Sequence, residues 1–216
     1  MKKLPLIFLL LGGLPLAWTP AVASAEPAPP PPSAATAAAA PRQVIEQLDN
    51  ALLTAMKEAK KLGYAGRYRS LAPAIERVYD FPGIAALVLG SHWAKLSPAQ
   101  QREFIATLRD YTIATYAARF DGYAGERFAI KSVQPLPPSR VVVSSTLTET
   151  DGKVHTLDYL LQPVGGEWRV INVVADGVSD LALKQAEFTH LLELKGFPGL
   201  IAGLKGYIAR MAQSGV

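Results

Sequence analysis

The stretch RVVVSSTLTETDGKVHTLDYLLQPVGGEWRVINVV, residues 140–174, decides the fold. Apolar side chains recur along it at every second position, or nearly so, in three runs: Val141, Val143 and Leu147; Leu157, Tyr159 and Leu161; and Trp168, Val170, Ile171, Val173 and Val174. A period of two with one apolar face is typical of half-buried antiparallel strands. The stretch therefore predicts three neighbouring strands of one sheet.

A fourth strand precedes these three, because Phe128 and Ile130 alternate with charged residues. The connections between strands are short. Asp151-Gly152 and Gly165-Gly166 are two-residue hairpin signals, and residues 135–139 form a looser loop. Short local connections predict a four-stranded antiparallel meander.

Helical patterns precede the strands. Apolar residues recur at helical spacing from Val44 to Leu62, where Gly63 supplies a stop, and a short second helix follows through Tyr68 and Tyr79. Asp80 is placed to cap a third helix, with Pro82 in its first turn and Gly90 at its end. Ser97, Pro98 and Gln100 form a capping-box start for a fourth helix that runs to about Asp121.

Two more helical segments follow the strands, one ending at Gly196 and one opening at Pro198. Helices, four strands and helices predict an α+β domain over residues 42–216, with the helices on one face of a curved sheet. The sequence predicts an apolar cavity between this sheet face and the helix that begins after Ser97.

The first residues indicate export. Met1-Lys2-Lys3 is a basic start, an apolar run extends to Trp18, and small residues follow at 21–25. This order predicts a signal peptide over residues 1–25, cut after Ala25. An uncleaved anchor is the alternative, but the apolar run is shorter than the about 20 residues that span a bilayer. Residues 26–41, EPAPPPPSAATAAAAP, are predicted to be a disordered spacer.

Composition argues against several classes of protein. The chain has no cysteine, so it carries neither a disulfide nor a lipid-modified cysteine. Its formal net charge is +4, but Lys2 and Lys3 belong to the predicted signal peptide. The other basic residues are scattered, which argues against a nucleic-acid partner. A transient contact with an anionic membrane surface is compatible with this charge.

Motifs for catalysis are missing from the sequence. The three histidines, His92, His155 and His190, lie far apart and show no metal-ligand spacing. His155 and Tyr159 share one face of a predicted strand, and an apolar pocket with such a pair could perform acid–base chemistry. The alternative is a core tyrosine beside a histidine near a strand end. We expect no catalytic residue, no metal and no cofactor.

Aromatic residues on the helices have two interpretations. They are ordinary core, or they form the wall of a lipid cavity, for which several hydroxyl-bearing rings are suited. On the second interpretation the candidate lipid-binding residues are Trp93, Phe104, Leu108, Tyr111, Tyr116, Phe120, Val143, Tyr159, Leu161, Val170, Phe188 and Leu192.

Several segments resemble one protein family. YDFPGIAALVLG at 79–90 followed by Trp93, SPAQQREF at 97–104, TYAARFDGY at 115–123 and WRVINVVADGVSDLALKQAEF at 168–188 are similar to the MlaC, or toluene-tolerance auxiliary, family of periplasmic phospholipid-binding proteins. The segments FDGYAGERF and SDLALKQAEF look closest to the hopanoid-biosynthesis-associated branch, HpnM. Ala86 and Gln185 depart from the phospholipid branch, which has arginine near both places.

The resemblance implies an NTF2-like or cystatin-like sheet with a cavity against the helices. It also implies a periplasmic carrier that shuttles a phospholipid or hopanoid between an inner-membrane transporter complex and an outer-membrane complex. Two alternatives stay open: an NTF2-like isomerase acting on a polycyclic lipid, and an envelope adaptor without a ligand.

Overall fold

The computed structural model describes residues 34–214. The helices are α1 (Ala34–Lys57), α2 (Ala59–Val78), α3 (Phe81–Leu89), a 3₁₀ helix (Gly90–Lys95), α4 (Pro98–Arg119) and α5 (Asp180–Ser214), and the strands are β1 (Arg127–Leu136), β2 (Arg140–Thr148), β3 (Val154–Val164), β4 (Glu167–Ala175) and β5 (Val178–Ser179). The predicted signal peptide and residues 26–33 of the predicted spacer lie outside the described residues.

The strands form one antiparallel meander in the order β1-β2-β3-β4-β5. The α+β prediction with an antiparallel sheet between helices is therefore confirmed, but the sheet has five strands and not four. The additional strand, β5, is only two residues long. A pair of residues is too short for alternation to show, so the sequence pattern could not reveal it.

The two predicted hairpins differ. Val164 pairs with Glu167, so Gly165 and Gly166 form the expected two-residue connection. Between β2 and β3 the last pair is Thr148 with Val154, which leaves a five-residue loop at 149–153. Within that loop the Gly152 amide donates to the Glu149 carbonyl at 3.1 Å. The prediction of a two-residue turn at Asp151-Gly152 was wrong, because these two residues belong to a five-residue loop.

Several helix ends follow the predicted signals. Asp80 caps α3, Gly90 ends it at φ 51°, and Ser97 with Gln100 forms the capping box of α4. Gly63 (φ 57°) and Gly196 (φ 66°) break the helical conformation inside α2 and α5. Both glycines adopt a backbone conformation that side chains with a Cβ disfavour.

Two helix starts come earlier than predicted. α1 begins at Ala34, inside the segment predicted as spacer, because alanine has the highest intrinsic helix propensity and needs no apolar periodicity. α2 begins at Ala59, well before the expected start near Tyr68. Periodicity locates the buried face of a helix, and it does not locate the exposed turns at the ends.

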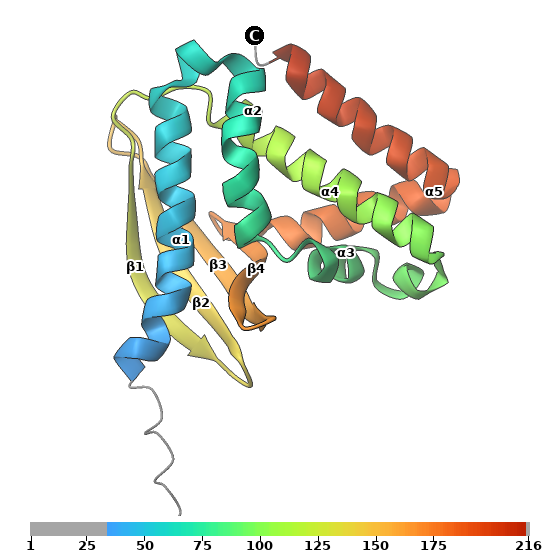
Figure 1. Cartoon of the computed structure of the whole chain (residues 1–216), viewed down its shortest axis with the longest axis horizontal. Helices are drawn as coiled ribbons and strands as arrows, with labels where there is room; N and C mark the ends of the chain where they lie inside the picture. The colour runs from blue at the N-terminus through green and yellow to red at the C-terminus, as the bar shows by residue number, and fades with distance from the viewer. Residues whose placement is uncertain (1–33, 215–216) are drawn as a thin grey trace, which may run out of the picture. The chain divides into compact units, whose positions relative to one another are not determined.

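The helices cover one face of the sheet (Figure 1). α1 contacts β1, β2 and β4, and α2, α3 and α5 contact β4, while α4 packs against α2 and α5. The core lies between this layer and the inward face of the sheet, where Val143, Tyr159, Leu161 and Val170 are buried. Val143 pairs with Tyr159, and Tyr159 pairs in turn with Val173.

The junction between α2 and α3 is tied to the sheet by polar groups. The Asp80 amide donates to the Val170 carbonyl at 3.0 Å. One oxygen of the Asp80 carboxylate accepts a hydrogen bond from the Gly83 backbone amide at 3.0 Å. The other accepts one from the Gln162 side-chain amide, also at 3.0 Å. A single buried side chain therefore caps α3 and links it to β3.

Replacing Asp80 tests this junction. We expect Asp80→Ala to lower the free energy of unfolding by about 2 kcal/mol, because both the cap and the bond from Gln162 are lost. Asp80→Asn keeps one oxygen for the cap, so it should lower the free energy of unfolding by only about 1 kcal/mol. Urea denaturation measures both values. Equal losses in the two variants would contradict the dual role of this carboxylate.

Candidate functional site

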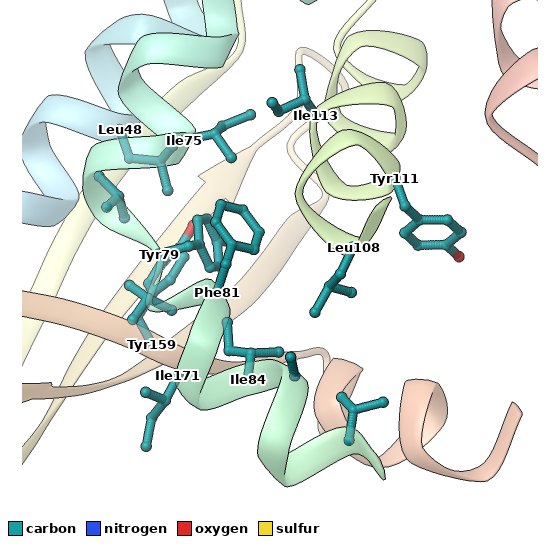
Figure 2. Close-up of a cluster of buried hydrophobic side chains, with 14 of the residues drawn as sticks. Leu48, Ile75, Tyr79, Phe81, Ile84, Leu108, Tyr111, Ile113, Tyr159 and Ile171 are labelled. Carbon is teal, nitrogen blue, oxygen red and sulfur yellow. The ribbon is translucent and has the colours of Figure 1, made fainter. Parts of the chain in front are cut away.

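A partly open cavity of about 150 Å³ lies between α4 and the ends of β3 and β4. Its wall comes from four regions: Tyr79 and Ile84 at the α2–α3 junction and in α3; Leu108, Thr112, Thr115, Tyr116, Arg119 and Phe120 along α4; Leu157, Tyr159, Val173 and Ala175 on the sheet; and Asp180 and Lys184 at the start of α5. In Figure 2, Tyr79 and Tyr159 lie close to Phe81, while Leu108 extends from α4 and Ile84 from α3.

The cavity has a buried end and an exposed end. Tyr79, Ile84, Leu108 and Tyr159 are all buried. Arg119, Ala175 and Asp180 are exposed and mark the rim. Between the two ends the wall is largely aliphatic and aromatic. Such a wall binds apolar ligands by burial.

Tyrosine hydroxyls occupy the buried end. The Tyr79 and Tyr116 hydroxyls are hydrogen-bonded to each other. Burial raises the pKa of Tyr116 to about 12 and raises the pKa values of Tyr79 and Tyr159 well above the ordinary tyrosine value. All three phenols are therefore neutral at physiological pH. They can exchange hydrogen bonds with a ligand but are poor proton donors and acceptors in catalysis.

Ionic groups gather at the exposed end. The Lys184 ammonium lies 2.5 Å from both carboxylate oxygens of Asp180 and 5.6 Å from the centre of the Tyr111 ring. The Lys184 side chain is 11% exposed and that of Asp180 is 54% exposed. A buried cation needs such a partner. With Arg119, this pair gives the rim groups that can meet a polar headgroup.

A buried acid, Asp49 of α1, lies near Tyr116 and Tyr159. One of its carboxylate oxygens, Oδ1, has no hydrogen-bond partner within residues 34–214. Burial raises the pKa of Asp49 to about 7 from its ordinary value of 3.8, against an opposing contribution from the Ser145 hydroxyl. The neutral acid is the form that a partly unsatisfied buried site favours.

Four of the predicted lipid-binding residues line the cavity: Leu108, Tyr116, Phe120 and Tyr159. The others lie elsewhere in the fold. Val143, Leu161 and Val170 are fully buried in the core beneath the helices, and Phe104 and Phe188 pack edge to face with ring centres 6.3 Å apart. Tyr111 stacks on Tyr207, and Trp93 and Leu192 are partly buried against the core. Lipid contact by these residues stays a prediction.

Sequence reasoning missed several wall residues. Tyr79 was assigned to a helix, but it ends α2 and pairs with Val170 of β4, and this pairing turns it to the cavity. Neither Thr112 nor Thr115 of α4 was among the candidate lipid-binding residues, although both line the cavity. Lys184 gave one usable signal, since it follows Asp180 at the i,i+4 spacing of a helical ion pair.

The proposed acid–base pair of His155 and Tyr159 does not form. His155 Nδ1 lies 2.6 Å from Asp176 and its Nε2 lies 2.8 Å from Glu149, so both ring nitrogens face carboxylates. These two hydrogen bonds raise the pKa of His155. Tyr159 points into the cavity instead. Across residues 34–214 no group of three or more histidine or carboxylate side chains is arranged to hold a metal ion.

The helices between residues 34 and 214 include none with the length and apolar character needed to cross a bilayer.

The buried acid gives a testable pH dependence. A native pKa of about 7 against 3.8 means that the folded state binds more protons than the unfolded state between these values. The stability of the protein should therefore fall as pH rises through this window. Asp49→Asn should remove that fall and raise the free energy of unfolding at pH 8 by at most about 4 kcal/mol.

Urea denaturation at pH 5 and pH 8 measures the free energy of unfolding at each pH. Asp110→Asn, a substitution of a partly exposed acid on α4, is the control and should leave the pH dependence in place. If the stability of the Asp49→Asn protein falls as much between pH 5 and pH 8 as that of the unchanged chain, Asp49 is not the acid responsible.

Comparison with known proteins places this geometry in a family. The model of the MlaC protein family matches residues 46–206. Toluene tolerance protein ttg2D of Pseudomonas putida is 24% identical over 181 residues, which are 81% of this chain and 84% of that relative. The intermembrane phospholipid transport system binding protein MlaC of Haemophilus influenzae is 25% identical over 122 residues, which are 55% of this chain and 57% of its own length.

A solved structure supports the same fold. The phospholipid-binding protein from Ralstonia solanacearum, determined in complex with a phospholipid, aligns with a TM-score of 0.70 at 20% sequence identity. The alignment covers 79% of this chain and 97% of that chain. The fold of helices over an antiparallel sheet is thus shared, and the match over residues 46–206 shows that the chain belongs to the MlaC family.

Proposed function

We propose that this chain is a periplasmic phospholipid carrier that holds the apolar part of a lipid in the cavity between α4 and the sheet. The observation that carries the proposal is the apolar cavity, open at one end, in a chain of the MlaC family. Its relatives include a phospholipid transport binding protein and a structure in complex with a phospholipid. By analogy, the carrier exchanges its lipid with an inner-membrane transporter complex and an outer-membrane complex.

Burial of the tails provides the binding energy. Each CH₂ group that leaves water contributes about 0.8 kcal/mol. The rim ions contribute less, since a surface charge interaction is typically worth under about 1 kcal/mol. A carrier needs an apolar cavity and an open end, and it needs no reactive group.

The cavity must widen to accept a lipid. About 150 Å³ is the size of an engineered cavity that takes up benzene, whereas drug-sized ligands occupy about 300–1,000 Å³. Lipid entry therefore requires α4 and α5 to move away from β3 and β4. The wall favours this movement, because Thr112, Thr115 and Leu157 are only partly buried and are not locked in the core.

The cavity chemistry supports the carrier over the isomerase. The wall contains no histidine, and its one carboxylate, Asp180, is exposed and bound by Lys184. Its phenols are neutral. An adaptor with a completely filled core would have no such cavity.

Filling the cavity tests the proposal. Val173 lines the cavity, so Val173→Trp should reduce co-purified phospholipid at least about fivefold while the protein stays folded. The matched control is Val154→Trp on the neighbouring strand, at a side chain that is 54% exposed. Organic extraction and mass spectrometry of the bound lipid, with circular dichroism for folding, make the comparison. Equal lipid in both variants would place the lipid elsewhere.

Salt separates burial from charge attraction. Raising ionic strength from low to molar should leave lipid retention nearly unchanged, because screening weakens the rim ions and not the burial of tails. Retention is measured by lipid content after gel filtration in each buffer. Release of most of the lipid at molar salt would show that the headgroup contacts dominate.

The hopanoid preference stays a prediction. A neutral polycyclic lipid needs no partner for an anionic group, which suits a rim whose buried cation is already paired with Asp180. Displacement of a bound fluorescent fatty-acyl probe, with a hopanoid compared against a phospholipid, tests it. Displacement by phospholipid alone would discard the hopanoid assignment.

A further inference from the structure

We propose that Tyr79, Tyr116 and Tyr159 form a hydrogen-bonding site for an oxygen atom carried on the buried, apolar part of the ligand. The site lies among the buried residues of the cavity wall. This inference rests on the proposed carrier function and narrows the class of lipid that the carrier selects.

Three separate elements bring these tyrosines together. Tyr79 comes from the α2–α3 junction, Tyr116 from α4 and Tyr159 from β3, and all three line the cavity. Tyr79 is held by its pairing with Val170, and Tyr159 sits in the central register between Val143 and Val173. The position of each hydroxyl is therefore set by the fold.

The hydroxyls have an unused donor. Tyr79 and Tyr116 each carry one phenolic proton, and the bond between them uses one of the two. Within residues 34–214 no acceptor receives the second proton, and no partner bonds the Tyr159 hydroxyl. Buried polar groups are normally satisfied, so this pattern indicates a place for a ligand atom.

Two other tyrosines differ from this group. The Tyr68 hydroxyl lies beside the Asp110 carboxylate, and the Tyr111 hydroxyl lies beside that of Tyr207. Both have a partner in the protein. The Tyr64 hydroxyl of α2 is also buried without a partner, but Tyr64 is not among the residues that line the cavity.

The remaining wall defines the ligand class. Ile84, Leu108, Leu157 and Val173 offer no polar side-chain atom, and the ions lie at the rim. A ligand with its headgroup at the rim places its far end against the tyrosines. A saturated tail brings only a methyl group there, whereas a hydroxyl, keto or ester oxygen accepts the spare proton. The favoured ligand is a lipid that is oxygenated at its buried end.

Fatty acids with and without an ω-hydroxyl group test the site. Each acid of a series of chain lengths is compared with its ω-hydroxy analogue by displacement of a fluorescent fatty-acyl probe. The proteins are the unchanged chain, Tyr116→Phe, Tyr159→Phe and the control Tyr68→Phe. The measured quantity is the affinity of the ω-hydroxy acid divided by that of the plain acid.

At the chain length that reaches the inner end, this ratio should be about two- to tenfold higher in the unchanged chain than in Tyr116→Phe and Tyr159→Phe. Tyr68→Phe should keep the ratio of the unchanged chain, because Tyr68 does not line the cavity. Unchanged binding of the plain acid shows that a variant is folded. If Tyr116→Phe does not fold, the ratio measured for Tyr159→Phe alone decides the test.

The same ratio in all four proteins at every length would overturn the site while leaving the carrier function standing. Failure of both acids to displace the probe from the unchanged chain at any length would instead overturn the carrier function, and the site with it.

Discussion

The architecture depends on the attachment of the α2–α3 junction to β4. The hydrogen bond from the Asp80 amide to the Val170 carbonyl fixes this junction on the sheet, and the Asp80 carboxylate starts α3 from the same point. Tyr79 is the adjacent residue, so the same attachment directs its ring into the cavity beside Tyr116. One polar connection thus sets both the packing of the helix layer and the chemistry at the inner end of the cavity.

The cavity exists because the helix layer is filled unevenly. Near Val143, Leu161 and Val170 the helices pack directly on the sheet, and these side chains are fully buried. Toward the ends of β3 and β4, where Leu157 and Ala175 lie, the packing opens and the wall is partly exposed. A tightly packed half supplies stability, and a loosely packed half can admit a ligand.

The sequence predicts the strands and most helix ends well, because alternation, caps and helix-ending glycines are local signals. Asp80, Ser97 and the Gly165-Gly166 turn all act as predicted. The cavity wall is less accessible to such reasoning. A period of two identifies the inward face of a strand, but it does not tell which inward residues meet a helix and which meet a space. Val143 and Tyr159 are neighbours on one face, yet only Tyr159 reaches the cavity. Thr112 and Thr115 join the wall because α4 stands away from the sheet there.

The most direct test of the proposed lipid carrier is a crystal structure of the protein loaded with phospholipid. We expect acyl chains between α4 and the β3–β4 face, in contact with Leu108 and Val173, and a headgroup at the rim near Arg119 and Lys184. We also expect a larger separation of α4 from β3 than in the unloaded protein. Acyl chains bound at another surface, with the cavity unchanged at about 150 Å³, would contradict the proposal.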